Sequence, residues 1–205
     1  MKIVIISGSS RPNSQTRKIA DWVQNKLQAM SVQTALVDLH ESLLPLDQNI
    51  LDFKTNPKLQ AAWEPFADAL SGADAVQIIS PEWDGMAPPA LMNFFVFASE
   101  AGKPLAHKPM GLITVSSTDG GSYPAAELRV HGPKNNHTFY TPELMIIRHC
   151  EKVFNTPDPE PGNDADVYLQ KRAAFGLSVL VEYAKAMKSL RETTPIDLLS
   201  YPNGM

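Results

Sequence analysis

Short runs of apolar residues alternate along the chain with longer stretches in which apolar residues recur at helical spacing. The short runs, beginning with the β-branched run Ile3–Ile6, are typical of strands buried on both faces of a sheet. The longer, amphipathic stretches predict helices. We expect strands at Lys2–Ile6, Val32–Leu39, Ala75–Ile79 and Met110–Val115, a fifth strand within Phe139–Ile147, and helices at Gln15–Met30, Leu59–Leu70, Ala90–Ala101, Tyr123–Val130 and Asp164–Leu190.

The order of these elements predicts the fold class. Residues 43–57 are polar and proline-bearing and indicate a long connection, and the last dozen residues indicate a tail. Strand and helix alternate, which favours one α/β domain over residues 1–205, with a parallel sheet covered by helices on both faces. In such sheets ligands bind beyond the carboxyl ends of the strands. The loops after the first, third and fourth predicted strands are therefore the candidates for a site.

The first of these loops, Ser7–Ser14, has the residues that an anion site needs. It leads from a strand into a helix, whose N-terminus offers unpaired N–H groups and partial positive charge. Ser9, Ser14 and Thr16 add hydroxyl groups, and Arg11 adds a guanidinium group suited to phosphate oxygens. The loop lacks the glycine patterns of dinucleotide sites and P-loops, which favours a phosphate monoester over a pyrophosphate. The alternative is a plain turn in which Ser14 caps the helix.

The other two loops favour a flat ligand. Residues 80–93 form a proline-rich segment in which Gly85 permits a tight bend, and a stiff loop can present backbone groups to the edge of a planar heterocycle. Trp83 is suited to line one side of a bound ring or to pack on a partner subunit. In residues 116–121, two adjacent glycines allow the backbone to pass close to a ring. The alternatives are a connector with a core tryptophan and an ordinary Asp-Gly-Gly turn.

Composition and charge exclude several classes of protein. The chain has 205 residues, 43% of them hydrophobic and 20% charged, which is ordinary for a globular protein with no need of disulfides or metals. The net charge of −4 does not indicate nucleic-acid binding, which needs a basic surface. No apolar run approaches the roughly 18 residues of a membrane span. The N-terminal apolar run is too short for a secretion signal. The single cysteine, Cys150, is compatible with a reducing compartment, so we expect a cytoplasmic protein.

Together these motifs resemble those of the NADPH-dependent FMN reductase family, a flavodoxin-like group that includes quinone, azo-dye and chromate reductases. Residues 8–14 (GSSRPNS) resemble the family's Gly-Ser-x-Arg-x-x-Ser phosphate loop, and residues 80–84 (SPEWD) resemble its Thr/Ser-Pro-Glu-Tyr-Asn segment. Pro88–Asn93 is similar to the family pattern Pro-Gly-x-Leu-Lys-Asn, and residues 116–121 resemble the glycine-rich loop beside the flavin ring. The resemblance covers Lys2–Arg129 well and the rest of the chain only by pattern.

The resemblance implies a flavodoxin-like three-layer α/β fold with a five-stranded parallel sheet. It also implies bound FMN near the subunit interface of a homodimer or homotetramer, with NADPH or NADH as electron donor. By that resemblance the phosphate contacts Ser9, Arg11, Ser14, Gln15 and Thr16, and the flavin ring contacts Pro81, Glu82, Trp83, Asp84, Gly85, Ser116, Ser117, Gly120 and Gly121. The expected reaction passes electrons from NAD(P)H through the flavin to a quinone or another small acceptor. Since the flavin carries the chemistry, we predict no catalytic side chain.

Other polar and reactive residues predict no additional chemistry. Glu82 and Asp84 are too close together on a stiff loop to suggest an acid–base pair, and we expect turn formers and rim charges. Cys150 adjoins an apolar run and is expected to be an inert core thiol. No metal site is predicted, because the candidate histidines lack a partner at ligand spacing and suit solvated or core positions; they are His107, His131, His137 and His149.

Departures from the family pattern keep two alternatives open. Met92 and Pro89 stand where the family has lysine and glycine, Val96 stands where it has an acidic residue, and residues 131–140 take a different course. One alternative is an electron carrier of the flavodoxin type without nicotinamide activity, although the mild net charge argues against it. The other is a non-catalytic domain that has lost its cofactor. Rapid NADPH oxidation would exclude the carrier, and failure to take up FMN would favour the non-catalytic domain.

Overall fold

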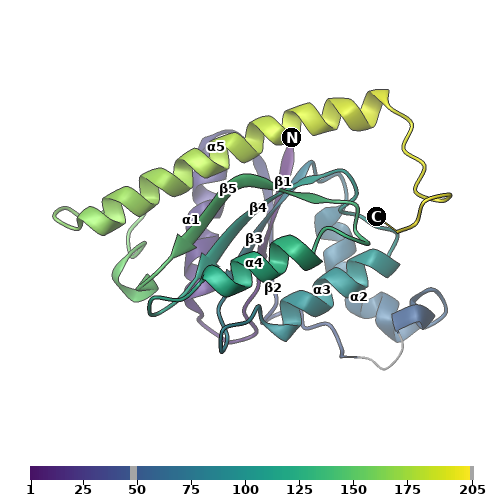
Figure 1. The fold of residues 1–205 in the computed structure, drawn as a ribbon, viewed down its shortest axis with the longest axis horizontal. Coiled ribbons are helices and arrows are strands. Elements are labelled where there is room, and N and C mark those ends of the chain that lie inside the picture. Colours follow the sequence, from purple (N-terminus) through teal and green to yellow (C-terminus); the bar gives the residue numbers. More distant parts are fainter. Residues whose placement is uncertain (47–49, 204–205) are drawn as a thin grey trace.

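The computed structural model describes residues 1–46 and 50–203 and is built around a five-stranded sheet. The strands are β1 (Lys2–Ser7), β2 (Gln33–Asp38), β3 (Ala75–Pro81), β4 (Pro109–Val115) and β5 (Phe139–Ile147). They lie in the order β2-β1-β3-β4-β5, and every neighbouring pair is parallel (Figure 1). This is the strand order of the flavodoxin-like fold, so the predicted fold class is confirmed.

Helices cover both faces of the sheet. One face carries α1 (Gln15–Ala29) and α5 (Asp164–Thr193), and the other carries α2 (Pro57–Leu70), α3 (Pro89–Glu100) and α4 (Ser122–His131) (Figure 1). Two short 3-10 helices, η1 (Ile50–Lys54) and η2 (Cys150–Lys152), lie in connections. Although α5 has 30 residues, no helix in the described ranges is both long and apolar enough to cross a membrane.

The pleat of β1 explains why its sequence is apolar without interruption. Successive side chains of a strand point to opposite faces. Ile3 and Ile5 therefore pack under α1 and α5, while Val4 and Ile6 pack under the helices of the other face, and all four side chains are fully buried. The carboxyl end of β1 is thus fixed between two cores, which positions the loop that follows it.

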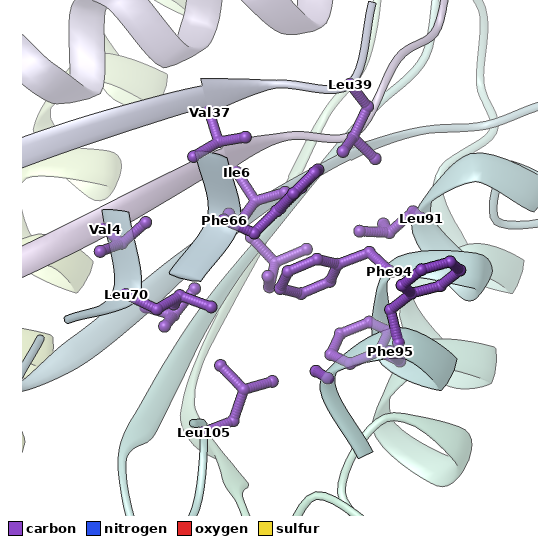
Figure 2. Close-up of a cluster of buried hydrophobic side chains, with 14 of the residues drawn as sticks. Val4, Ile6, Val37, Leu39, Phe66, Leu70, Leu91, Phe94, Phe95 and Leu105 are labelled. Carbon is purple, nitrogen blue, oxygen red and sulfur yellow. The ribbon is translucent and has the colours of Figure 1, made fainter. Parts of the chain in front are cut away.

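Aromatic residues of α2 and α3 fill much of the second core (Figure 2). The rings of Trp63 and Phe66 stack with centroids 5.0 Å apart, and Phe66 and Phe94 lie 5.7 Å apart. Such pairs add about 0.5–1.5 kcal/mol beyond their burial. This packing holds the N-terminus of α3, where the proline-rich segment after β3 ends.

The predicted elements are all present, with differences at their ends. The segment predicted as a plain connection contains η1, whose Phe53 ring packs against Phe97 at a centroid distance of 6.2 Å; residues 47–49 of that segment lie outside the described residues. Helix α2 begins earlier than predicted, at Pro57, because the Asn56 side chain caps it by accepting the Lys58 N–H group. Helix α5 extends to Thr193, and residues 204–205 of the predicted tail lie outside the description.

Candidate functional site

A cavity of about 450 Å³ lies at the carboxyl ends of β1, β3, β4 and β5. This volume is within the usual range for small-molecule sites. The loop or helix start after each of these strands contributes to the wall, which consists of Arg11, Gln15, Thr16, Pro81, Glu82, Asp84, Gly85, Val115, Ser116, Ser117, Thr118, Cys150 and Glu151. The cavity is at the edge of the sheet where the sequence predicts a site.

The structure brings most of the predicted site residues to this cavity and leaves some outside its wall. Those that line it are Arg11, Gln15, Thr16, Pro81, Glu82, Asp84, Gly85, Ser116 and Ser117. Ser9, Ser14, Trp83, Gly120 and Gly121 are not among the lining residues. Each of these five has a role in holding the loops together, and those roles define the shape of the site.

The loop after β1 is attached to the neighbouring strand and to the helix that follows. The Gly8 N–H group donates to the Ile79 carbonyl of β3 at 2.8 Å, and a Cβ atom at Gly8 would lie 2.8 Å from the same oxygen. Ser9 is fully buried, and its Oγ accepts the Arg11 N–H group. Ser14 caps α1 by accepting the Arg17 N–H group at 3.1 Å. The alternative anticipated for Ser14, a helix cap, is what the structure shows.

The N-terminus of α1 forms one wall of the cavity. Gln15 and Thr16 are its first residues, and the first turn holds no acidic side chain that would neutralise the helix dipole. The Gln15 Oε1 atom is buried and, within the described residues, has no hydrogen-bond partner. Buried polar atoms are rarely left unpaired, so this oxygen is available to a ligand.

Two arginines near this helix start differ in how much of their charge is already used. Arg17 forms ion pairs with Asp21 at 2.9 Å and with the buried Asp38 at 3.1 Å, and these carboxylates raise the pKa of its guanidinium group. Arg11 is exposed and forms no ion pair with any described residue; its guanidinium carbon lies 5.7 Å from the centre of the Trp83 ring. Arg11 is therefore the arginine whose charge remains available to the cavity.

Residues 83–86 form a tight hairpin beside the cavity. Trp83 and Met86 exchange backbone hydrogen bonds of 2.9 and 2.8 Å. Asp84 and Gly85, at the turn, have positive φ angles of 49° and 78°, as a two-residue type I′ turn requires. The Trp83 Nε1 atom is buried without a partner among the described residues, although Trp83 itself does not line the cavity.

Glu82 joins the loops after β3 and β4. Its carboxylate accepts the Gly121 N–H group, and a Cβ atom at Gly120 would lie 2.5 Å from the same carboxylate. Gly121 has a φ of 97°, and a Cβ atom there would lie 2.5 Å from the Ile146 side chain. The two glycines thus make room for protein groups, where the sequence suggested room for a flat ligand.

The loop after β4 faces the cavity with its first residues. Ser116 Oγ accepts the Thr118 N–H group at 3.2 Å, and the Ser116 N–H group donates to the Ile147 carbonyl of β5. Arg148 Nε donates to the Asp119 carbonyl at 2.7 Å, which ties the glycine-rich end of the loop to the residues after β5. Thr118 lines the cavity and lies within the loop 116–121 that the sequence analysis selected, whereas Val115 lines it without having been selected.

The segment after β5 supplies wall residues that sequence reasoning missed, Cys150 and Glu151. The Lys18 ammonium group donates hydrogen bonds of 2.8 to 2.9 Å to oxygen atoms of residues 150, 153 and 155, so α1 holds this segment in place. Cys150 is buried as predicted, and burial raises the pKa of its thiol. The sequence feature that could have identified Cys150 and Glu151 is their position, since they follow the fifth strand at the same edge of the sheet.

Comparisons with known proteins bear on the family and the fold. The sequence model of the family described as NADPH-dependent FMN reductase matches residues 1–151, which takes the match past Arg129 and through β5. No curated protein is significantly similar to the chain in sequence.

Solved structures with the same architecture include flavoenzymes. FerB, a flavoenzyme NAD(P)H:(acceptor) oxidoreductase from Paracoccus denitrificans, has a TM-score of 0.66 at 20% identity, with 92% of this chain and 97% of that chain covered. RosB with bound 8-demethyl-8-formylriboflavin-5′-phosphate has a TM-score of 0.69 at 17% identity, covering 98% and 84%. An azoreductase from Bacillus anthracis strain Sterne has a TM-score of 0.54 at 14% identity, covering 92% and 99%. At these identities the likeness establishes the fold.

Proposed function

Because the chain belongs to the NADPH-dependent FMN reductase family, we propose that it uses FMN to pass electrons from NAD(P)H to a quinone or another small acceptor. The observation that carries the proposal is the cavity at the carboxyl edge of the sheet, whose wall includes the buried, unpaired Gln15 Oε1 atom and the Arg11 guanidinium group, which has no ion-pair partner among the described residues. The volume of about 450 Å³ and the donor-rich α1 end fit a flavin with a phosphate group.

The phosphate end of FMN is assigned to the start of α1. Arg11 supplies a guanidinium group without a carboxylate partner in the described chain, and Gln15 and Thr16 place the helix N-terminus on the cavity. A phosphate there combines a charge-assisted hydrogen bond with the helix dipole. Ser9 and Ser14 act on this site by shaping the loop, through their bonds to the Arg11 and Arg17 N–H groups.

The ring of FMN is assigned to the space between the loops after β3 and β4. Pro81, Asp84 and Gly85 line one side, and Ser116 and Ser117 line the other. The Glu82–Gly121 hydrogen bond fixes the two loops relative to each other before any ligand arrives. Such preorganisation reduces the loss of entropy on binding.

When bound, FMN supplies the two-electron chemistry, so the side chains bind and orient. Reduction of one quinone to the hydroquinone consumes one NAD(P)H and one proton, which solvent provides. The hydroxyl groups of Ser116 and Ser117 and the backbone groups of the hairpin are suited to hold polar edges of a ring. None of the lining side chains is assigned a covalent or acid–base step.

We also propose a cytoplasmic homodimer or homotetramer. Apolar side chains of α3 and α4 that are exposed in a single chain support an assembly; they are Val96 at 44%, Tyr123 at 74% and Val130 at 70% exposure. Light scattering of the purified protein measures the number of subunits directly. A monomer at micromolar concentration would contradict this part of the proposal.

The visible spectrum tests the central proposal. Purified protein is titrated with FMN, and NADPH or NADH is then added without oxygen. We expect flavin absorbance to accompany the protein, to bleach on addition of the nicotinamide, and to return on addition of a quinone. Absence of FMN uptake at micromolar concentration would contradict the proposal. Bleaching that needs a separate reductase would instead support an electron carrier.

A further inference from the structure

The charged side chains around the cavity are unbalanced. Besides Arg11, the wall contains the carboxylates of Glu82, Asp84 and Glu151. Glu82 is engaged with the Gly121 N–H group. Throughout residues 1–46 and 50–203, neither the Asp84 nor the Glu151 carboxylate forms an ion pair or accepts a hydrogen bond. Two uncompensated negative charges therefore border the site.

These two carboxylates approach the cavity from different loops. Asp84 is exposed at the tip of the hairpin after β3, and Glu151 is exposed in η2 after β5. Glu151 interacts over a longer range with the Lys18 ammonium group. Its ammonium group is occupied by oxygen atoms of residues 150, 153 and 155. Even with Lys18 counted, the three carboxylates among the lining residues outnumber the lining cation and this lysine.

Bound FMN increases this imbalance. A phosphate monoester carries about −1.5 to −2 charges near neutral pH, and Arg11 is the lining cation available to it. Once Arg11 faces the phosphate, it no longer offsets Asp84 and Glu151. The remaining space, where an acceptor has to approach the flavin, is bordered by negative charge.

Resting on the proposed function, we propose that the site selects neutral or cationic acceptors and rejects anionic ones such as sulfonated quinones, and that Asp84 and Glu151 set this preference. For a substrate charge about 8 Å from a carboxylate, at a dielectric constant of about 40, the Coulomb energy changes a rate or binding constant about fivefold. Two carboxylates together give about 25-fold discrimination per substrate charge at low ionic strength. Because exposed charges are screened by salt, the discrimination falls as ionic strength rises.

The experiment uses the FMN-loaded protein and a matched set of naphthoquinones that carry no charge, a sulfonate or a trimethylammonium group. The value of kcat/KM is measured for each at saturating NAD(P)H, in low and high sodium chloride. The same set is run on the double variant Asp84→Asn/Glu151→Gln. Glu192→Gln is the control, since it removes an exposed charge near the end of α5, next to Arg191, which bonds to Asp74 at the amino end of β3.

We expect kcat/KM to be lowest for the sulfonate, and the double variant to raise the sulfonate-to-neutral ratio about 25-fold at low salt, with little change in the control. Because the substituents also alter the reduction potential of the quinone, the ratio of variant to parent is the deciding quantity. A sulfonate-to-neutral ratio that neither salt nor the double variant changes would overturn the charge preference while leaving quinone reduction intact. A loaded protein that NAD(P)H reduces but that reduces no quinone of any charge would overturn the charge preference together with the quinone as acceptor. A loaded protein whose flavin NAD(P)H does not reduce would overturn the proposed function as well.

Discussion

Replacement of Arg11 by alanine separates phosphate recognition from every other contribution to flavin binding. The side chain is exposed and contacts the Trp83 ring, and its own backbone N–H bond to Ser9 Oγ does not depend on the guanidinium group. A cation–π contact at an exposed site is worth about 0.5–1 kcal/mol, so the variant should fold with nearly unchanged stability. Any larger effect on FMN binding then reports on the phosphate.

The expected magnitude follows from the kind of contact that is lost. A hydrogen bond to a charged group contributes about 1.5–3 kcal/mol, which corresponds to a rise of about 10- to 150-fold in the dissociation constant of FMN. Riboflavin has no phosphate, so its affinity for Arg11→Ala should match that for the parent protein. Arg11→Lys should fall between the two, because lysine keeps the charge and loses the planar fork.

The assay is a titration of the cofactor-free protein with FMN and, separately, with riboflavin, followed by quenching of flavin fluorescence. Arg129→Ala is the matched control, because Arg129 is exposed in the last turn of α4 and does not line the cavity. Equal FMN affinity in Arg11→Ala and parent would refute the phosphate assignment. An equal loss for FMN and riboflavin would also refute it, since Arg11 would then act through the hairpin.

Three further substitutions test two carboxylates that fix loops and one buried lysine that lowers the stability of the fold. Glu82→Ala removes the acceptor of the Gly121 N–H group and should lower the free energy of unfolding by about 1.5–3 kcal/mol; hydrogen exchange should accelerate at Gly121 beyond the global effect, and unchanged exchange there would contradict the assignment. Asp166→Ala leaves the Phe154 N–H group without its acceptor at 2.7 Å, and the free energy of unfolding measured in urea should fall by about 2–3 kcal/mol. An unchanged urea midpoint would mean that solvent replaces this hydrogen bond. Lys108→Met should raise the melting temperature at pH 7, because burial lowers the pKa of Lys108 to about 8 from 10.5. Between about pH 8 and 10.5 the unfolded chain binds more protons than the folded one, so the free energy of unfolding of the parent rises with pH and the advantage of the variant should shrink. A constant difference in melting temperature from pH 7 to 10 would contradict this account.

The fold could be predicted because its signals are local and repeated. The fully buried run Ile3–Ile6 requires a two-sided sheet, and the strand–helix alternation then leaves few arrangements. The limits of elements were harder to place because backbone hydrogen bonds and caps decide them. Asn56, for example, moves the start of α2 to Pro57 through a single side-chain bond. The 3-10 helix η1 packs on α3 through a contact between Phe53 and the distant Phe97, which no local pattern reveals.

The place of the site could be predicted better than the direction of its side chains. The rule for parallel sheets predicts the edge at which the cavity lies, and Arg11 and Gln15 line that cavity. The same rule could not distinguish a hydroxyl group that faces a ligand from one that shapes the loop, as Ser9 does. Glu151 was missed because only the loops after the first, third and fourth predicted strands were taken as candidates, although a fifth strand was expected within Phe139–Ile147.

The polar groups at this edge divide into two sets with different consequences. Glu82 and Ser14 are engaged in bonds that fix the loops, so their loss should reduce stability and flavin affinity together. Arg11 and Gln15 Oε1 line the cavity and have no such bond within the described part of the chain, so their loss should reduce affinity with little effect on stability. A protein that leaves buried polar atoms unpaired beside a preformed cavity gives up stability that a ligand restores. FMN should therefore raise the melting temperature of the parent protein more than that of variants in the second set.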